Sequence, residues 1–333
     1  MKICSLSNLQ NLFASLEEKY ELLLPVRLLD GTRSLGRLKD GDLHLEGGAL
    51  PMRPAALFMP YLDLILKISK EGTAKAAPNL AKPLFIVGFT AEDLACLEFT
   101  DKFFSTNFYD EIYFKNRQDA VVVGVSGYLG SDGEFLKVAG GKCDLEIIKL
   151  EDGGFIIEAY SEKGSEILKN LNANEADSQI LEVLKEKSAN LVSEDEILLR
   201  QASQLLLEGR VPDEFWQDIA KRCIACTACT LVCPTCTCFD VFDRKTRNSD
   251  IERMRLRDSC QLDGFMREAS GHNPMAKEFL RTRRRIHHKL VADVRRFGHI
   301  TCYFCGRCDQ ACPTGIGIKS VCREMVARYW NVV

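Results

Sequence analysis

Eight cysteines in the C-terminal third of the sequence form two copies of one short motif. The motif is C-x2-C-x2-C-x3-C-P, and its two copies begin at Cys223 and at Cys302. Three thiolates at this spacing bind three irons of one [4Fe–4S] cube, and in two-cluster proteins the fourth cysteine ligates the other cube. The chemistry that these residues could perform is therefore the transfer of single electrons.

The motif predicts two [4Fe–4S] clusters with crosswise ligation. The expected ligands are Cys223, Cys226, Cys229 and Cys312 for one cluster, and Cys302, Cys305, Cys308 and Cys233 for the other. We also expect the proline after each fourth cysteine to begin a helix, because the first helical residue needs no N–H partner. Structural zinc also binds C-x2-C pairs. Zinc sites rarely use a third cysteine at the same spacing followed by Cys-Pro, so the clusters are favoured.

No residue of the motif is expected to be catalytic. A protein thiolate on every iron would leave no open position for a substrate, as in closed metal sites generally. The pattern therefore predicts an electron relay, with any enzyme chemistry on other subunits.

Three more cysteines lie near the motifs and are not needed for two clusters. They are Cys236, Cys238 and Cys260. One interpretation is buried structural thiols, since free cysteine is among the most buried residue types. The other is a further metal or redox site, with His272 as a possible additional ligand. The isolated cysteines are expected to be structural: Cys4, Cys96, Cys143 and Cys322.

The segment between the motifs is strongly basic. Residues 244–296 contain fifteen Lys or Arg against seven Asp or Glu, and RTRRRIHHK is the densest run. Three interpretations stay open: a phosphate-binding patch, a docking face for an acidic redox partner, and compensation of the anionic clusters. Nucleic acid is disfavoured because no reading module accompanies the charge. His287 and His288 are expected at the surface or facing a partner, not as metal ligands.

The bulk properties agree with a soluble globular protein. The chain has 333 residues, 46% hydrophobic and 27% charged, with a net charge of −3, so no overall field favours nucleic acid or an anionic membrane. No apolar run approaches the roughly 20 residues that span a bilayer, and the N-terminus predicts an amphipathic helix followed by a strand. Fifteen cysteines, an odd number, fit metal binding in a reducing cytoplasm better than a disulfide framework.

The elements that must position the cysteines suggest an α+β protein in three parts. Residues 1–170 are expected to form a mixed α/β domain, 171–221 a helical connector, and 222–333 a helical, ferredoxin-like dicluster domain. Expected strands are Ala81–Gly88, Asp119–Ser126, Leu145–Leu150 and Phe155–Tyr160, the last two joined by an Asp-Gly-Gly turn, with a helix capped by Thr90 after the first. Residues 172–178 are a candidate hinge, and much of 244–300 is expected to be helical.

The ordered signatures of the C-terminal part resemble a known family. They are RCIACTACTLVCPTCTCFDVFD, RDSC, GHNP before a basic helix, and CYFCGRCDQACP, within residues 216–320. The set resembles the iron–sulfur electron-transfer subunit of the anaerobic sulfite reductases and the β subunit of the cytoplasmic sulfhydrogenases, which are NAD(P)-linked [NiFe] hydrogenases. The resemblance implies a relay between two other subunits, without nucleic acid or a membrane span. One is a flavoprotein that binds FAD and NAD(P)H, and the other is a catalytic redox subunit that reduces sulfite or protons.

The resemblance also implies that Cys236, Cys238 and Cys260 belong to the family's pattern. The chain departs from it at Glu92, where relatives commonly have cysteine, and at Thr227, where glycine is common. Two alternatives remain open: a subunit of a heterodisulfide-reductase-like or electron-bifurcating complex, and an iron–sulfur redox sensor. An independent NAD or FAD enzyme is disfavoured because no G-x-G-x-x-G fingerprint follows a strand.

Overall fold

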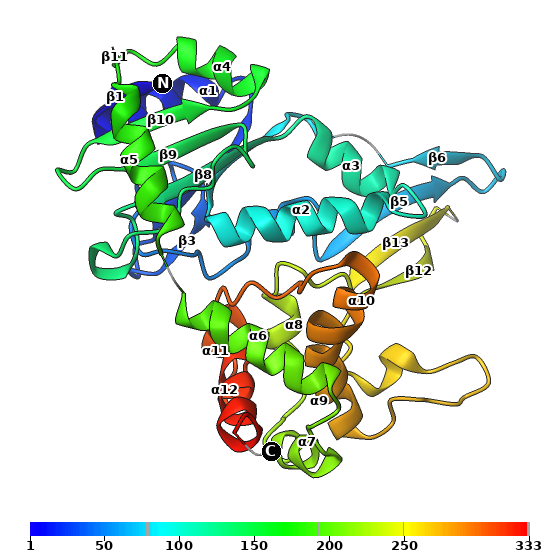
Figure 1. Ribbon diagram of the computed structural model, residues 1–333. Coiled ribbons are helices and arrows are strands. Elements are labelled where there is room, and N and C mark those ends of the chain that lie inside the picture. The colour runs from blue at the N-terminus through cyan, green and yellow to red at the C-terminus, as the bar shows by residue number, and fades with distance from the viewer. Residues whose placement is uncertain (78–79, 192, 249, 332–333) are drawn as a thin grey trace. The chain divides into compact units, whose positions relative to one another are not determined.

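The computed structural model describes residues 1–77, 80–191, 193–248 and 250–331 (Figure 1). The chain divides into two compact units. Unit 1 comprises Met1–Met59 and Pro78–Leu191, and unit 2 comprises Pro60–Ala77 and Val192–Val333. The mixed α/β character expected for the N-terminal part is confirmed, while residues 60–77 belong to the C-terminal unit.

Unit 1 is built on a nine-stranded sheet in the order β11-β1-β10-β9-β8-β7-β2-β3, with β4 also paired to β2. Its central strands β2, β7, β8 and β9 are parallel, and the outer pairs are antiparallel. The strands are β1 (Lys2–Cys4), β2 (Glu21–Arg27), β3 (Arg33–Gly36), β4 (Asp42–Leu43), β7 (Leu84–Phe89), β8 (Val121–Gly127), β9 (Leu145–Lys149), β10 (Phe155–Ala159) and β11 (Asn174–Glu175).

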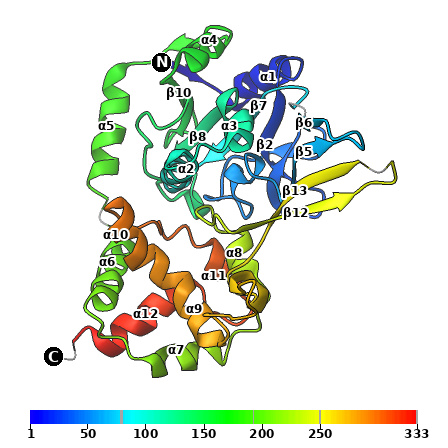
Figure 2. The ribbon, with the colours of Figure 1, turned by 90° about the vertical axis from the view of Figure 1, so that its right-hand side faces the viewer.

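Helices cover both faces of this sheet (Figures 1 and 2). They are α1 (Leu6–Leu16), α2 (Ala91–Ser105), α3 (Glu111–Gln118), α4 (Glu162–Lys169) and α5 (Ser178–Ala189), with 3-10 turns η1 (Pro54–Leu57) and η2 (Ser131–Gly133). Apolar side chains of α1 and α4 pack with Ile147 and Ile157, whereas those of α5 pack with Ile148 and Ile156. Because neighbouring strand residues point to opposite faces, α1 and α4 lie on one face and α5 lies on the other.

Most of the expected elements of unit 1 are confirmed. The four predicted strands are β7, β8, β9 and β10, and the Thr90 hydroxyl accepts from the N–H of Asp93 at the start of α2. The expected hinge at 172–178 instead contains β11, which pairs with β1. The backbone hydrogen bonds of this short strand were not visible in its polar sequence.

Unit 2 combines helices with a four-stranded sheet in the order β12-β13-β5-β6. The strands are β5 (Leu62–Ile68), β6 (Ala74–Ala76), β12 (Phe239–Lys245) and β13 (Ile251–Arg257). The helices are α6 (Glu194–Leu207), α7 (Asp213–Ala220), α8 (Ala228–Leu231), η3 (Asp263–Met266), α9 (Glu278–His287), the π-helical turn η4 (His288–Ala292), α10 (Asp293–Phe297), α11 (Arg307–Gln310) and α12 (Ile318–Tyr329). Side chains of α6, α7, α9, η4 and α12 share one apolar core.

The prediction that much of residues 244–300 is helical is wrong for the first half of that segment. β12 and β13 form an antiparallel hairpin there, and regular helix begins only at α9. Opposite charges face each other across the hairpin: Arg244 donates to Glu252 at 2.7 Å, and Arg253 donates to Asp243 at 2.8 Å. Such cross-strand pairs stabilise a sheet although their residue types are common in helices.

Among the described residues, no helix has both the length and the apolar character that crossing a bilayer would require.

Candidate iron–sulfur centre

The four cysteines expected to hold the first cluster line one cavity of unit 2. Cys223, Cys226 and Cys229 come from the first motif, and Cys312 comes from the second. Cys226 is exposed at the rim, whereas burial raises the pKa of Cys229 to about 11. A buried thiol with a raised pKa stays protonated in water, but binding to iron removes the proton. The cavity therefore has the donor set that an iron–sulfur cube requires.

Cysteines of the second expected set also come from both motifs. Cys302 and Cys308 lie close enough to Cys233 for its thiolate to raise their pKa values further, although burial is the larger cause. Cys305 is half-buried in the loop between Cys302 and Cys308. The fold thus places a cysteine of the first motif beside cysteines of the second.

The two motifs have matching backbone conformations around their middle cysteine. Ala225 and Thr227 flank Cys226 with φ of +53° and +64°, and Phe304 and Gly306 flank Cys305 with φ of +46° and +78°. These values lie in the left-handed region, which residues other than glycine rarely enter. The repeat of an uncommon conformation shows that the loops are structurally equivalent despite different residues.

A short helix follows each loop, and each fourth cysteine comes after it. The helices are α8, which contains Cys229, and α11, which contains Cys308. The expectation that the Cys-Pro proline begins a helix is wrong in both copies. Cys233-Pro234 leads through a turn into β12, and Cys312-Pro313 precedes α12 by five residues. At each site the threonine after the proline places its hydroxyl 3.5 Å from the cysteine sulfur.

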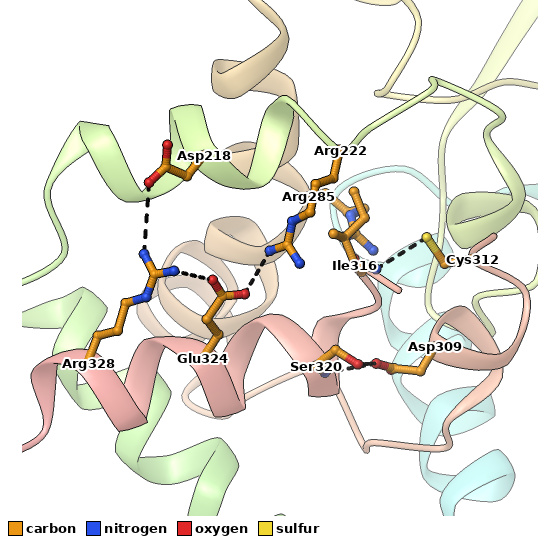
Figure 3. A network of polar contacts seen from close by, with 9 residues as sticks. All are labelled: Asp218, Arg222, Arg285, Asp309, Cys312, Ile316, Ser320, Glu324 and Arg328. Atoms are coloured by element: carbon orange, nitrogen blue, oxygen red, sulfur yellow. Dashed lines mark hydrogen bonds and ion pairs between the residues drawn. The ribbon is translucent and has the colours of Figure 1, made fainter. Parts of the chain in front are cut away.

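Backbone N–H groups after the second motif point at cysteine sulfurs. The N–H of Ile316 donates to Cys312 Sγ and that of Ile318 to Cys308 Sγ, both at 3.4 Å. Figure 3 shows the first contact beside the side chain of Arg285. Hydrogen bonds from Thr314 and Ile316 outweigh the opposing effect of burial and lower the pKa of Cys312. Donors to sulfur are one of the means by which proteins tune cluster potentials.

Asp309 holds this N–H loop in place. Its carboxylate accepts from the N–H groups of Lys319 and Ser320 at 3.1 and 2.8 Å, and from the Ser320 hydroxyl at 2.8 Å (Figure 3). It therefore satisfies free donors in the first turn of α12. Gly317 allows the approach, because a Cβ there would lie 2.2 Å from the Asp309 carboxyl carbon.

An ion network ties the start of the first motif to α12. Glu324 accepts from Arg222 at 2.7 Å and from Arg328 at 2.5 Å, and Arg328 also lies 3.9 Å from Asp218 (Figure 3). Arg222 directly precedes Cys223. The network therefore positions the residue from which the first cysteine loop begins.

The basic segment is divided between the interior and the surface. Arg281, Arg285 and Lys289 are buried, whereas Arg295 and Arg296 are exposed. Burial disfavours the charged forms of Arg285 and Lys289, yet neighbouring thiolates outweigh it and raise both pKa values. This favours compensation of negative charge as the role of those two residues. His287 and His288 are both half-buried, so the expectation of surface histidines holds only in part.

The three surplus cysteines come together in the interior. The Cys238 thiol hydrogen-bonds with those of Cys236 and Cys260, which raises the pKa of Cys238 and lowers that of Cys260. His272 is exposed. Within the described ranges, no group of three or more His, Cys, Asp or Glu is placed to hold a metal ion. Buried, hydrogen-bonded thiols describe the observed arrangement, and a further metal or redox site stays a hypothesis.

Sequence reasoning did not single out several residues of this centre. Arg285 and Lys289 were part of a basic run, and their four-residue spacing is the signal that places both on one helix face. Asp309 and Gly317 carry no motif of their own. The donors at Ile316 and Ile318 belong to the backbone, so their residue types could not reveal them.

Comparisons with known proteins agree with this geometry. The family described as "4Fe-4S dicluster domain" matches residues 222–316. Sulfhydrogenase 2 subunit beta of Pyrococcus furiosus is 28% identical over 294 residues, covering 85% of this chain and 86% of the relative. No solved structure matches the chain significantly. The chain is therefore a homologue of a sulfhydrogenase beta subunit, with a 4Fe-4S dicluster domain in its C-terminal part.

Proposed function

We propose that unit 2 holds two [4Fe–4S] clusters with crosswise ligation. Cys223, Cys226, Cys229 and Cys312 would hold the first, and Cys302, Cys305, Cys308 and Cys233 would hold the second. The observation that carries the proposal is the cavity whose lining joins three cysteines of one motif to the last cysteine of the other. The nearness of Cys233 to Cys302 and Cys308 supports the second set.

The function that follows is an electron relay within a multi-subunit oxidoreductase. The clusters would supply one-electron carriers, and the chain's residues bind, shield and tune them. The partners proposed are an FAD-containing flavoprotein subunit that takes electrons from NAD(P)H, and a catalytic subunit that reduces sulfite or protons in an anaerobic cytoplasmic complex. The resemblance to a sulfhydrogenase beta subunit over most of both chains supports this assignment.

Crosswise ligation can be tested by combining substitutions. Cys226→Ser and Cys312→Ser would damage the same cluster, so the double variant should keep about four of about eight irons per chain. Cys226→Ser with Cys305→Ser is the matched control, and it should lose both clusters. The measurement is iron content with electron paramagnetic resonance (EPR) on anaerobically purified protein. Loss of both clusters from the first double variant would contradict crosswise ligation.

The wild-type iron content tests the cluster number itself. About eight irons per chain support two clusters, and about twelve would mean that the surplus cysteines hold a further cube. Zinc without iron would overturn the proposal. Anaerobic purification of the native complex then tests the role: a flavoprotein and a sulfite- or hydrogen-converting subunit should copurify. Reduction of sulfite with NADH by the isolated chain would refute a pure relay.

A further inference from the structure

Two cationic side chains are buried one helical turn apart in unit 2. Arg285 near the end of α9 and Lys289 in η4 are each 3% exposed. Lys and Arg are almost never fully buried unless they are paired with negative charge. Each therefore requires an anion that compensates for its loss of water.

The cysteines of the two proposed clusters are placed to provide that negative charge. Arg285 lines the first cavity with Cys229 and Cys312, and it also interacts electrostatically with Cys308 of the second set. Lys289 interacts with Cys233 and Cys302, which both belong to the second set. One cation thus faces cysteines of both sets, and the other faces cysteines of only one.

The hydrogen bonds of Arg285 leave donors over for a ligand in the cavity. Its Nη2 donates to the Ile316 carbonyl at 2.6 Å. Its Nε and Nη1 are buried and have no hydrogen-bond partner within the part of the chain that the structure describes. A buried guanidinium with two unused donors is costly unless something accepts from it. The sulfur atoms of a bound cluster would be suitable acceptors.

Lys289 is held from the opposite side. Its ammonium donates to the Thr235 carbonyl at 3.3 Å and to the Thr235 hydroxyl. Thr235 also contacts Cys233 through that hydroxyl. The lysine charge is therefore fixed beside the cysteine that the first motif contributes to the second set.

We propose that Arg285 and Lys289 are the internal counter-charges of the two clusters and raise their reduction potentials. The inference rests on the proposed pair of clusters. Reduction adds an electron to a site that is already anionic, so a fixed cation in a weakly polar interior stabilises the reduced form more than the oxidised form. Arg285 acts on both clusters, and Lys289 acts on the one held by Cys233, Cys302, Cys305 and Cys308.

Redox titration followed by EPR, on anaerobically purified full-length protein, tests this assignment. Arg285→Gln should lower the one-electron reduction equilibrium constants of both clusters about tenfold, which corresponds to about 59 mV. Lys289→Gln should have a similar effect on one cluster only. The matched control is Arg283→Gln on the same helix, because Arg283 is partly exposed and paired with Asp213 at 2.5 Å. Less than a twofold change is expected there.

A charge-conserving variant separates tuning from damage to the fold. Arg285→Lys keeps the cation while losing donors, so it should restore more than half of the shift in potential caused by Arg285→Gln. Unchanged potentials in Arg285→Gln with full iron content would overturn the inference. If that variant loses iron, Lys289→Gln decides: a shift in one cluster supports the inference, and none overturns it. Wild-type protein without about eight irons would instead refute the proposed clusters.

Discussion

The left-handed residues of the two cysteine loops allow a reciprocal exchange. Thr227 and Gly306 occupy equivalent positions, with φ and ψ of +64° and −7° in the first loop and +78° and −16° in the second. We predict that Thr227→Gly stabilises unit 2 and that Gly306→Thr destabilises it. The reason is that the same backbone conformation suits glycine and penalises a β-branched residue.

The size of the effect follows from the conformations. A non-glycine residue in the left-handed region costs about 1–2 kcal/mol, and glycine gives back about 0.5–1 kcal/mol through the greater freedom of the unfolded chain. The net gain for Thr227→Gly is therefore about 0.5–1 kcal/mol. The Thr227 side chain makes no capping hydrogen bond that the change would remove. At Gly306 only the Gln310 side-chain nitrogen, at 3.9 Å, lies near an added Cβ, so the cost there is conformational.

Anaerobic differential scanning calorimetry at one fixed scan rate would compare the two variants with the wild type. A change of this size in a unit of this size should raise the unfolding midpoint of Thr227→Gly by about 1–4 °C and lower that of Gly306→Thr by a similar amount. Iron content should be equal in all three proteins, so that cluster loss does not contribute. Equal midpoints, or a lower midpoint for Thr227→Gly, would refute the reasoning.

Two further predictions concern the surroundings of the loops. Gly317→Ala should lower the unfolding midpoint and weaken iron retention, since the new Cβ would lie 2.4 Å from the Asp309 Cα and cost about 1–3 kcal/mol; Gly264→Ala, with nothing within 4 Å of an added Cβ, is the control and should leave iron retention unchanged. Burial lowers the pKa of His288 to about 3, so the unfolded chain takes up a proton below about pH 6.5 that the folded ring does not. Stability should therefore fall as the pH drops from about 7.5 to 5.5, and His288→Gln should reduce this fall when midpoints are compared across that range; an unchanged slope would contradict a neutral buried ring.

The strands of unit 1 were predictable because their apolar runs are long and their turns are marked. β8 is buried along its whole length, and an Asp-Gly-Gly turn separates β9 from β10. The cysteine sets were predictable in the same local sense, since their spacing alone fixes the motif. Both kinds of evidence lie within a few consecutive residues.

The features that escaped prediction depend on distant parts of the chain. The hairpin of β12 and β13 is stabilised by Arg244–Glu252 and Arg253–Asp243 pairs, whose charges in the sequence are equally compatible with a helix. Burial of Arg285 depends on the loop that carries Cys312, which lies 27 residues further along the chain. Whether a basic residue faces solvent or cysteines is decided by tertiary structure, and composition does not encode it.

The pairing of β13 with β5 has a consequence for how the protein is made. Leu256 pairs with Leu62, and Arg255 in β13 forms a buried ion pair with Asp63 at 2.9 Å. During translation β5 therefore leaves the ribosome long before its partner strand, and unit 2 cannot close its sheet until most of the chain has emerged. A gene fragment encoding only residues 222–316 would expose an unpaired strand edge that invites aggregation. For recombinant work, the smallest useful expression unit thus includes residues 60–77.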